Sequence, residues 1–313
     1  MTLTAAPLYT DVSPAPLDGA AYWTHASDGV RIRLGVWHPD GAKGTVLMFP
    51  GRTEYIEKYA PAAGDFAARG FATIAIDWRG QGIADRMLGD AMTGHVDLFQ
   101  DYQLDVSAMI AAARELNLPE PFFLVAHSMG GCIGLRALHE ALPVAAAAFT
   151  GPMWGIRISA HLRPLAWALG HLMPAIGQGH RLPPSTEPHP YVIKAPFEDN
   201  LLTTDRPMFD MMRAQLEAHP ELSLGGPSFV WLREALNETL DLSRMPSPPV
   251  PCETYLGTNE RIVHTGRIHD RMADWNGGTL HMIEGGEHEV LMETPEIRTG
   301  IFDSIAAAFT KAG

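Results

Sequence analysis

The chain has 313 residues, of which 46% are hydrophobic and 19% charged, and its formal net charge is −13. This composition excludes a disordered chain and a coiled coil, and two cysteines are too few for a disulfide scaffold. A chain of this length can bury roughly 75% of the surface that its unfolded form exposes, so we expect one sizeable core with at most a smaller module attached.

The sequence also indicates which binding partners and which cellular compartment to expect. A net charge of −13 repels nucleic-acid backbones and anionic lipid headgroups. No apolar run reaches the roughly 18 residues of a bilayer span, and the first residues lack the basic and apolar regions of a secretory signal. Cys132 and Cys252 stand far apart in apolar surroundings, which is typical of buried thiols in a reducing compartment. We therefore expect a cytoplasmic protein without a nucleic-acid partner or stable membrane insertion.

The chain begins with weakly patterned segments. The first twenty residues show no periodicity and predict an irregular arm. Residues 21–27 and 31–39 are half-polar and predict a hairpin at the edge of a sheet.

Four nearly continuous apolar runs follow. Runs without polar alternation are typical of strands covered on both faces, as in a parallel sheet. Between Leu98 and Ala113, apolar residues recur every three or four positions and predict a helix. The alternation of strand and helix predicts an α/β fold with a mostly parallel, doubly wound sheet. The apolar runs occupy residues 45–49, 71–76, 122–126 and 145–149.

The alternation stops after the sixth predicted strand, near Gly151, and resumes near Pro251 with two more strands at 252–256 and 278–283. We therefore expect a helical cap inserted into the core after strand six. The expected parts are a first core segment at 1–150, the cap at 151–245 and a second core segment at 246–313.

One predicted helix of the insertion carries an apolar stripe. Its spacing fits a helix that packs on the core, or a lid whose apolar face meets a greasy substrate or a membrane. The sequence leaves both interpretations open. The stripe consists of Leu162, Leu165, Leu169, Leu172, Met173 and Ile176.

The strongest chemical signal is the segment AHSMGG at residues 126–131. A strand that turns sharply into a helix through a serine flanked by small residues holds the hydroxyl in an exposed, strained elbow. Ala126 replaces the usual first glycine and is the smallest step up from it. Ser128 is therefore the predicted nucleophile.

A nucleophilic serine needs a basic histidine and an orienting carboxylate, which in this fold follow it in the order serine, acid, histidine. His288 follows the last predicted strand, whereas His281 lies inside it. The loop after the preceding strand offers one carboxylate, Glu260, and residues 150–153 offer none. We therefore assign His288 as base and Glu260 as acid.

Ester hydrolysis also needs donors for the oxyanion, each of which lowers the barrier by roughly 3 kcal/mol. We expect the backbone N–H groups of Met129, directly after the nucleophile, and of Arg52, in the loop after strand 45–49. The Arg52 side chain faces either solvent or an anionic group of the substrate.

As a set, several segments resemble the monoacylglycerol lipase and lysophospholipase group of α/β-hydrolases. The resemblance runs from about Ala21 to Phe309. The segments that carry it are FPGRTEY at 49–55, DWRGQG at 77–82, GHV at 94–96, LGGPS at 224–228 and GEHE at 286–289.

The resemblance implies a capped serine hydrolase of α/β-hydrolase fold that cleaves lipid-like carboxylic esters through an acyl-enzyme on Ser128. It implies no cofactor and no metal. The chain departs from the group's pattern at Ala126, at Ala84, where serine is usual, and at Glu260, where aspartate is usual. The extra methylene of Glu260 requires its loop to lie about 1 Å further back.

Apolar side chains of the insertion suggest an acyl pocket, for which we name Met153, Trp154 and Trp231. The same residue types also fill protein cores, so this prediction rests on composition alone. Acyl length, headgroup and oligomeric state cannot be inferred from the sequence.

Two other classes of function remain open. A serine aminopeptidase-like peptidase would need a cap carboxylate to hold the substrate amine, for which Glu187 and Asp199 are available. A non-catalytic ligand sensor on the same fold is disfavoured by the complete set of serine, acid and histidine. A metal hydrolase is weaker still, because His264 and His269 would lie about 140° apart around a helix.

Overall fold

The structure is a computed structural model that describes residues 3–13, 17–184 and 186–313. Within these residues one nine-stranded sheet runs in the order β1-β2-β3-β5-β4-β6-β7-β8-β9. The pairings from β1 to β5 are antiparallel, and those from β5 to β9 are parallel. The strands are β1 (Thr4–Ala6), β2 (Gly19–His25), β3 (Arg31–Trp37), β4 (Thr45–Phe49), β5 (Ala72–Asp77), β6 (Phe122–His127), β7 (Ala147–Thr150), β8 (Cys252–Gly257) and β9 (Gly278–Ile283).

Part of the N-terminal arm belongs to the sheet, which corrects the expectation of an irregular arm. Thr4–Ala6 pair with β2 and cover an edge whose backbone groups would otherwise be open. The strand that ends at Thr150, the sixth in our prediction, is therefore the seventh. Residues 1–2 and 14–16 of the predicted arm lie outside the described residues.

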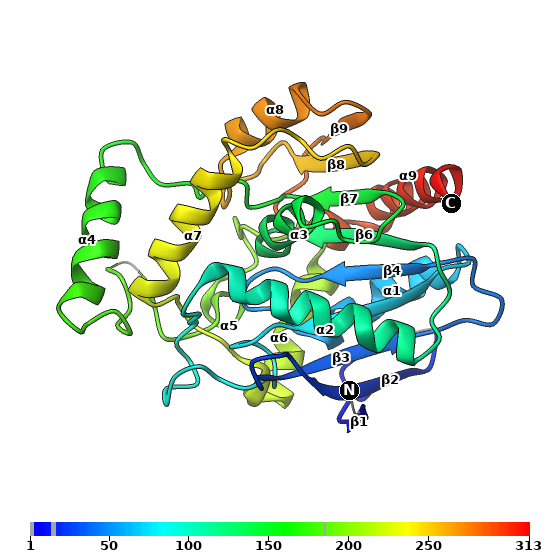
Figure 1. Ribbon diagram of the computed structural model, residues 1–313, viewed down its shortest axis with the longest axis horizontal. Helices are drawn as coiled ribbons and strands as arrows, with labels where there is room; N and C mark the ends of the chain where they lie inside the picture. The colour runs from blue at the N-terminus through cyan, green and yellow to red at the C-terminus, as the bar shows by residue number, and fades with distance from the viewer. Residues whose placement is uncertain (1–2, 14–16, 185) are drawn as a thin grey trace.

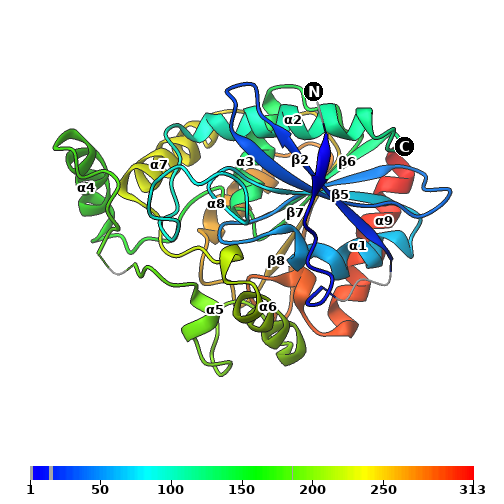
Figure 2. The same ribbon diagram turned by 90° about the horizontal axis from the view of Figure 1, so that it is seen from below.

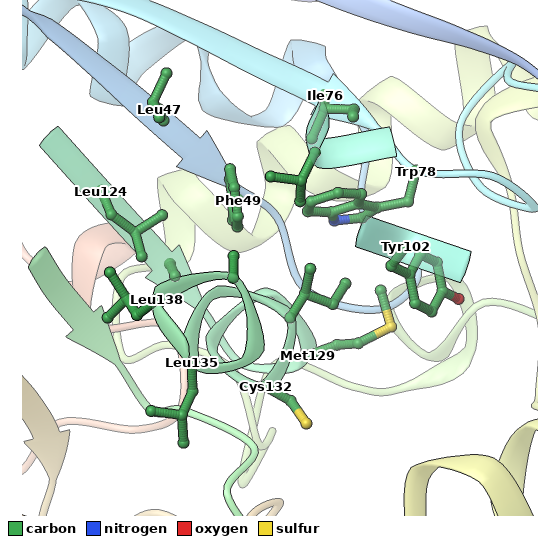
Figure 3. Packing of buried hydrophobic residues seen from close by; sticks show 14 of the residues in the cluster. Leu47, Phe49, Ile76, Trp78, Tyr102, Leu124, Met129, Cys132, Leu135 and Leu138 are labelled. Atoms are coloured by element: carbon green, nitrogen blue, oxygen red, sulfur yellow. The ribbon is translucent and has the colours of Figure 1, made fainter. Parts of the chain in front are cut away.

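The central strands are buried on both faces, as their continuous apolar sequences predict. In β4, Leu47 and Phe49 point into one hydrophobic cluster, and Val46 and Met48 point into the cluster on the opposite face. Figure 3 shows the first of these clusters, where side chains of β4 and β6 meet those of α3. Apolar residues at every position are therefore required here, because no face of these strands meets water.

Helices cover both faces of the sheet (Figures 1 and 2). Helices α2, α3 and α8 pack on one face, and α1 and α9 pack on the other. The helices of the core are α1 (Ala60–Ala67), α2 (Tyr102–Glu115), α3 (Met129–His139), α8 (Thr265–Ala273) and α9 (Pro295–Ala312), with short 3₁₀ turns η1 (Ile56–Tyr59), η2 (Phe99–Asp101) and η4 (Val290–Met292). No helix in the described part of the chain is both long enough and apolar enough to cross a membrane.

In the segment between β7 and β8, the described residues form four further helices. Of these, α4 projects away from the sheet and packs against α7 (Figure 1). Leu162, Leu165, Leu172 and Ile176 along the predicted stripe are 47% to 58% exposed, so that stripe does not pack on the core. The helices are α4 (Arg163–Ala175), α5 (Tyr191–Lys194), α6 (Arg206–Ala218) and α7 (Phe229–Leu242), with the 3₁₀ turn η3 (Pro220–Leu222).

Candidate active site

Ser128 stands at the sharp turn between β6 and α3. Its φ of +49° lies in the left-handed region, where a residue with a side chain is strained. The turn requires glycine at position 130, because a Cβ there would lie 2.1 Å from the carbonyl oxygen of Phe49. Ala126 is accommodated because Gly134 of α3 lies against it, and a Cβ on Gly134 would come within 3.2 Å of the Ala126 Cβ.

His288 and Glu260 form a hydrogen-bonded pair. The Nδ1 of His288 donates to Glu260 Oε2 at 2.6 Å, and Glu260 Oε1 accepts the backbone N–H groups of Ile262 and Val263 at 2.6 and 3.0 Å. Burial by itself raises the pKa of Glu260, but the charge and hydrogen bond of His288 and the two backbone donors outweigh it and lower the pKa. The carboxylate is therefore ionised and fixed in orientation at neutral pH.

The pair reaches the same cavity as the serine. Ser128 and His288 both line a cavity of about 280 Å³. Gly151 makes room for the pair, because a Cβ at this position would lie 3.0 Å from His288 Nδ1 and 3.2 Å from Glu260 Oε2. Among the described residues no hydrogen bond joins the Ser128 hydroxyl to His288, and such contacts often form only when substrate is bound.

The loop after β4 carries Arg52, which lines the same cavity. On either side of Arg52, the Gly51 N–H donates to the Glu54 carboxylate and the Thr53 N–H donates to Gln81 Oε1 at 2.9 Å. The Arg52 N–H has no acceptor among the described residues. The N–H of Met129 is the first of α3 and has no partner within the helix. These two N–H groups are the ones that the sequence prediction assigns to the oxyanion.

A buried cluster of charges lies beside the nucleophile. Lys58 Nζ bonds the carboxylates of Glu54 and Glu289, the latter at 2.6 Å, and His127 Nε2 lies 3.2 Å from Glu289 Oε2. Burial by itself raises the pKa of Glu289, but His127 and Lys58 outweigh it and hold the pKa well below its usual value. Tyr59 completes the cluster by donating to Glu54 at 2.5 Å.

Three members of this cluster could hold a metal ion by geometry. One ligand atom each from Glu54, His127 and Glu289 lies within 4.8 Å of the others. The ammonium of Lys58 already bonds both carboxylates, so a cation of the chain itself compensates their charge.

The predicted substrate-binding residues do not line the cavity. Met153, Trp154 and Trp231 are 3% to 6% exposed and belong to the core, where Trp154 Nε1 donates to the Gly131 carbonyl and Trp231 Nε1 to the Tyr102 hydroxyl. All three therefore belong to the hydrophobic core, and Trp154 also lines a separate hollow beside α8. The apolar wall of the cavity is instead formed by Pro190, Tyr191, Val192, Leu201, Leu202, Met212, Leu216 and Ile262.

Sequence reasoning also missed the residues that hold the loop of Arg52. Trp78 Nε1 donates to the Pro50 carbonyl at 2.9 Å, and Gln81 Nε2 donates to the Gly51 carbonyl at 3.1 Å. Both residues lie in the DWRGQG segment, which was noticed only as a resemblance. Polar side chains in a segment that follows a buried strand were the available signal for this role.

The fold agrees with comparisons to known proteins. Residues 40–295 match the family described as serine aminopeptidase, S33 (Hydrolase_4). The fold is the α/β-hydrolase fold, and the chain is an esterase- or lipase-like α/β-hydrolase. It belongs to the Hydrolase_4 family, and the resemblance stated from the sequence is confirmed.

Individual relatives are similar over most of the chain. Lysophospholipase L2 of Escherichia coli is 29% identical over 299 residues, covering 91% of this chain and 85% of that protein. A probable lysophospholipase L2 of Haemophilus influenzae is 27% identical over 88% of each chain. A soluble variant of monoglyceride lipase from Saccharomyces cerevisiae, solved with a substrate analog, aligns over 98% of this chain and 99% of its own, with a TM-score of 0.72 at 18% identity.

Proposed function

We propose that this protein is a serine hydrolase that cleaves lysophospholipids or monoacylglycerols through an acyl-enzyme on Ser128. The observation that carries the proposal is the cavity itself. Ser128 and His288 both line it, Glu260 is hydrogen-bonded to the histidine, and the residues that the insertion contributes to the lining are apolar. The similarity to two lysophospholipases supports an ester of this class.

The proposed reaction uses each of these residues in turn. Ser128 Oγ attacks the carbonyl carbon while His288 Nε2 takes its proton, and the carbonyl oxygen becomes an oxyanion held by the N–H groups of Arg52 and Met129. His288 then returns the proton to the leaving alcohol oxygen as the ester bond breaks. Water, deprotonated by His288, attacks the acyl-enzyme and releases the fatty acid and the free Ser128 hydroxyl.

Helices of the insertion form one side of the cavity, and we propose that residues 151–245 act as a cap. Tyr191 and Val192 come from α5, and Met212 and Leu216 come from α6. An apolar wall beside a reacting carbonyl favours a substrate with an acyl chain, because burial of each methylene contributes about 0.8 kcal/mol.

The carboxylates that would hold the amine of a peptide substrate are already paired. Glu187 bonds Lys194 at 2.5 Å, and Asp199 bonds Arg261 at 2.7 Å, both on the surface. Neither lines the cavity of Ser128. The family's description as aminopeptidases therefore makes peptide hydrolysis an arm of the test rather than our proposal.

The test is hydrolysis of p-nitrophenyl esters from short to long chains, a monoacylglycerol, a lysophospholipid and an aminoacyl p-nitroanilide. We expect activity that rises with chain length and extends to at least one of the lipids, and Ser128→Ala at background with an unchanged circular dichroism spectrum. Activity on short esters alone, or on the nitroanilide alone, would overturn the proposed substrate class.

A further inference from the structure

The side chain of Arg52 is an uncompensated cation next to the nucleophile. It is partly buried rather than directed into solvent, and its Nη1 donates to the Gly225 carbonyl of the insertion at 2.8 Å. The guanidinium carbon lies 5.6 Å from the centroid of the Trp231 ring. No carboxylate of the described residues lies within ion-pair distance of it, and Gly225 is its one hydrogen-bond acceptor there.

Other arginines of the interior are compensated. Arg33 and Arg79 each pair with two carboxylates at 2.7 or 2.8 Å. Arg86 donates to four peptide carbonyls at 2.6 to 3.1 Å. Burial lowers the pKa of Arg52 to about 10, because little in its surroundings replaces the water it has lost. A guanidinium has five N–H donors, and that of Arg52 has one acceptor among the described residues, so its other donors can bind an anionic ligand.

Arg52 lies in the wall between two hollows. The first is the cavity of Ser128 and His288. The second, of about 450 Å³, shares Arg52, Thr53, Pro190 and Tyr191 with it. Its further lining combines polar and charged side chains with apolar residues and glycines, namely Thr186, Glu187, His189, Lys194, Ala195, Leu224, Gly225, Gly226 and Pro227. Arg52 thus lines two hollows, and the insertion contributes polar and charged side chains to the second but only apolar ones to the first.

We propose that the Arg52 guanidinium binds the phosphate of the substrate's headgroup in this second hollow, which makes lysophospholipids the preferred esters over uncharged monoacylglycerols. The inference rests on the proposed function and refines its substrate class. The planar fork of a guanidinium matches two phosphate oxygens and forms charge-assisted hydrogen bonds with both.

A lysophospholipid carries one group for the Arg52 backbone N–H and one for the Arg52 side chain. Its ester carbonyl and its phosphate are attached to the same glycerol. The Arg52 backbone N–H is directed to the oxyanion of the ester, and the Arg52 side chain lies beside the neighbouring hollow. A substrate with both groups therefore engages both parts of Arg52, whereas a monoacylglycerol engages only the backbone.

The first arm of the test compares substrates. We would measure kcat/KM for a lysophospholipid and a monoacylglycerol of the same acyl chain, below their critical micelle concentrations, in the wild type and in Arg52→Gln. The ratio of kcat/KM for the lysophospholipid to kcat/KM for the monoacylglycerol should be roughly tenfold to a hundredfold lower in Arg52→Gln than in the wild type. The reason is that hydrogen bonds to charged groups contribute more than those between neutral groups. A ratio within twofold of the wild type would overturn the inference, whatever the absolute rates.

Arg86→Gln is the matched control, because Arg86 is another partly buried arginine without a carboxylate partner and lines neither hollow. Its substitution should leave the ratio of kcat/KM values unchanged. If both variants lower the ratio equally, general loosening of the structure explains the effect and the inference fails.

The second arm measures binding of the headgroup without lipid hydrolysis. Because it uses the wild type, it still tests the inference if Arg52→Gln does not fold. Glycerol 3-phosphate should inhibit wild-type hydrolysis of a neutral short ester competitively, and glycerol should not. Equal inhibition by inorganic phosphate would overturn the headgroup assignment in favour of a general anion site. If the wild type hydrolyses neither lipid, the proposed function fails. Inhibition by glycerol 3-phosphate then still tests whether the protein binds the phosphate headgroup.

Discussion

Two histidine–glutamate pairs lie side by side in this protein, and their rings are 4.7 Å apart between centroids. In the first, His288 Nδ1 is bonded to Glu260, and no hydrogen-bond partner among the described residues occupies its Nε2. In the second, His127 Nδ1 lies 3.0 Å from the Thr150 carbonyl, and Nε2 makes no hydrogen bond among the described residues but lies at ion-pair distance, 3.2 Å, from Glu289 Oε2. His288 Nε2 has no ion-pair partner among the described residues, and it is the nitrogen that we propose exchanges a proton with Ser128.

The charges around each pair explain the difference. Glu260 is held by two backbone N–H groups and one histidine, which orient it without enclosing it in further charge. Glu289 shares a closed cluster with Lys58 and His127, in which each charge is compensated by another. The same two residue types serve chemistry in one setting and stability in the other, because burial among opposite charges fixes the protonation state.

The largest effect that separates the pairs should come from replacing the histidines. We expect His288→Gln to lower kcat for an ester on the order of a millionfold, because the base of a serine hydrolase acts as one unit with its nucleophile. Steady-state rates on a p-nitrophenyl ester measure this effect. A loss of tenfold or less would show that His288 is not the base.

Glu260→Gln should lower kcat about a thousandfold to ten-thousandfold and leave the fold intact, since the amide no longer holds the correct histidine tautomer. Glu253→Gln is the matched control, because Glu253 also bonds a histidine, His281 Nε2 at 2.5 Å, and lies with it on β8 and β9, the strands that Glu260 and His288 follow, without lining the cavity. Equal rates for the two variants would place the acid elsewhere.

Lys58→Met tests the closed cluster through stability. Loss of the ammonium leaves the buried carboxylates of Glu54 and Glu289 uncompensated, which we expect to destabilise the protein by about 3–5 kcal/mol. Urea unfolding measures this change. The same substitution at Lys194, whose partner Glu187 is exposed, should cost less than about 1 kcal/mol. Similar losses at both sites would contradict the role of the cluster.

The smallest effect concerns pH. Burial by itself lowers the pKa of His127, but Glu289 and Glu54 outweigh it and raise the pKa above 6.5. Because the folded pKa exceeds the unfolded one, the stabilisation is complete below pH 6.5 and is lost as the pH rises through the folded pKa. The difference in unfolding free energy between wild type and His127→Gln should therefore shrink from pH 6 to pH 9. A constant difference would show that His127 is not charged in the fold.

Local patterns in the sequence predicted the strands of the sheet except β1. The runs at β4 and β6 are apolar at every position because both faces of these strands are buried, and that requirement is visible without coordinates. The strand–serine–helix turn at Ser128 is equally local. Glu260 and His288 could be singled out because each follows a strand, and the ends of parallel strands meet at one edge of the sheet.

Long-range contacts determined the features of the site that local patterns could not predict. The cluster of Glu54, Lys58, His127 and Glu289 joins three segments that are far apart in the chain, so no spacing rule could assemble it. Met153, Trp154 and Trp231 lie in the core and do not line the cavity of Ser128, which composition could not reveal because apolar side chains suit a core and a pocket equally. The direction of the Arg52 side chain depended on a carbonyl in the insertion, 173 residues away. Composition and periodicity report which residues avoid water, whereas tertiary packing decides which neighbours they meet.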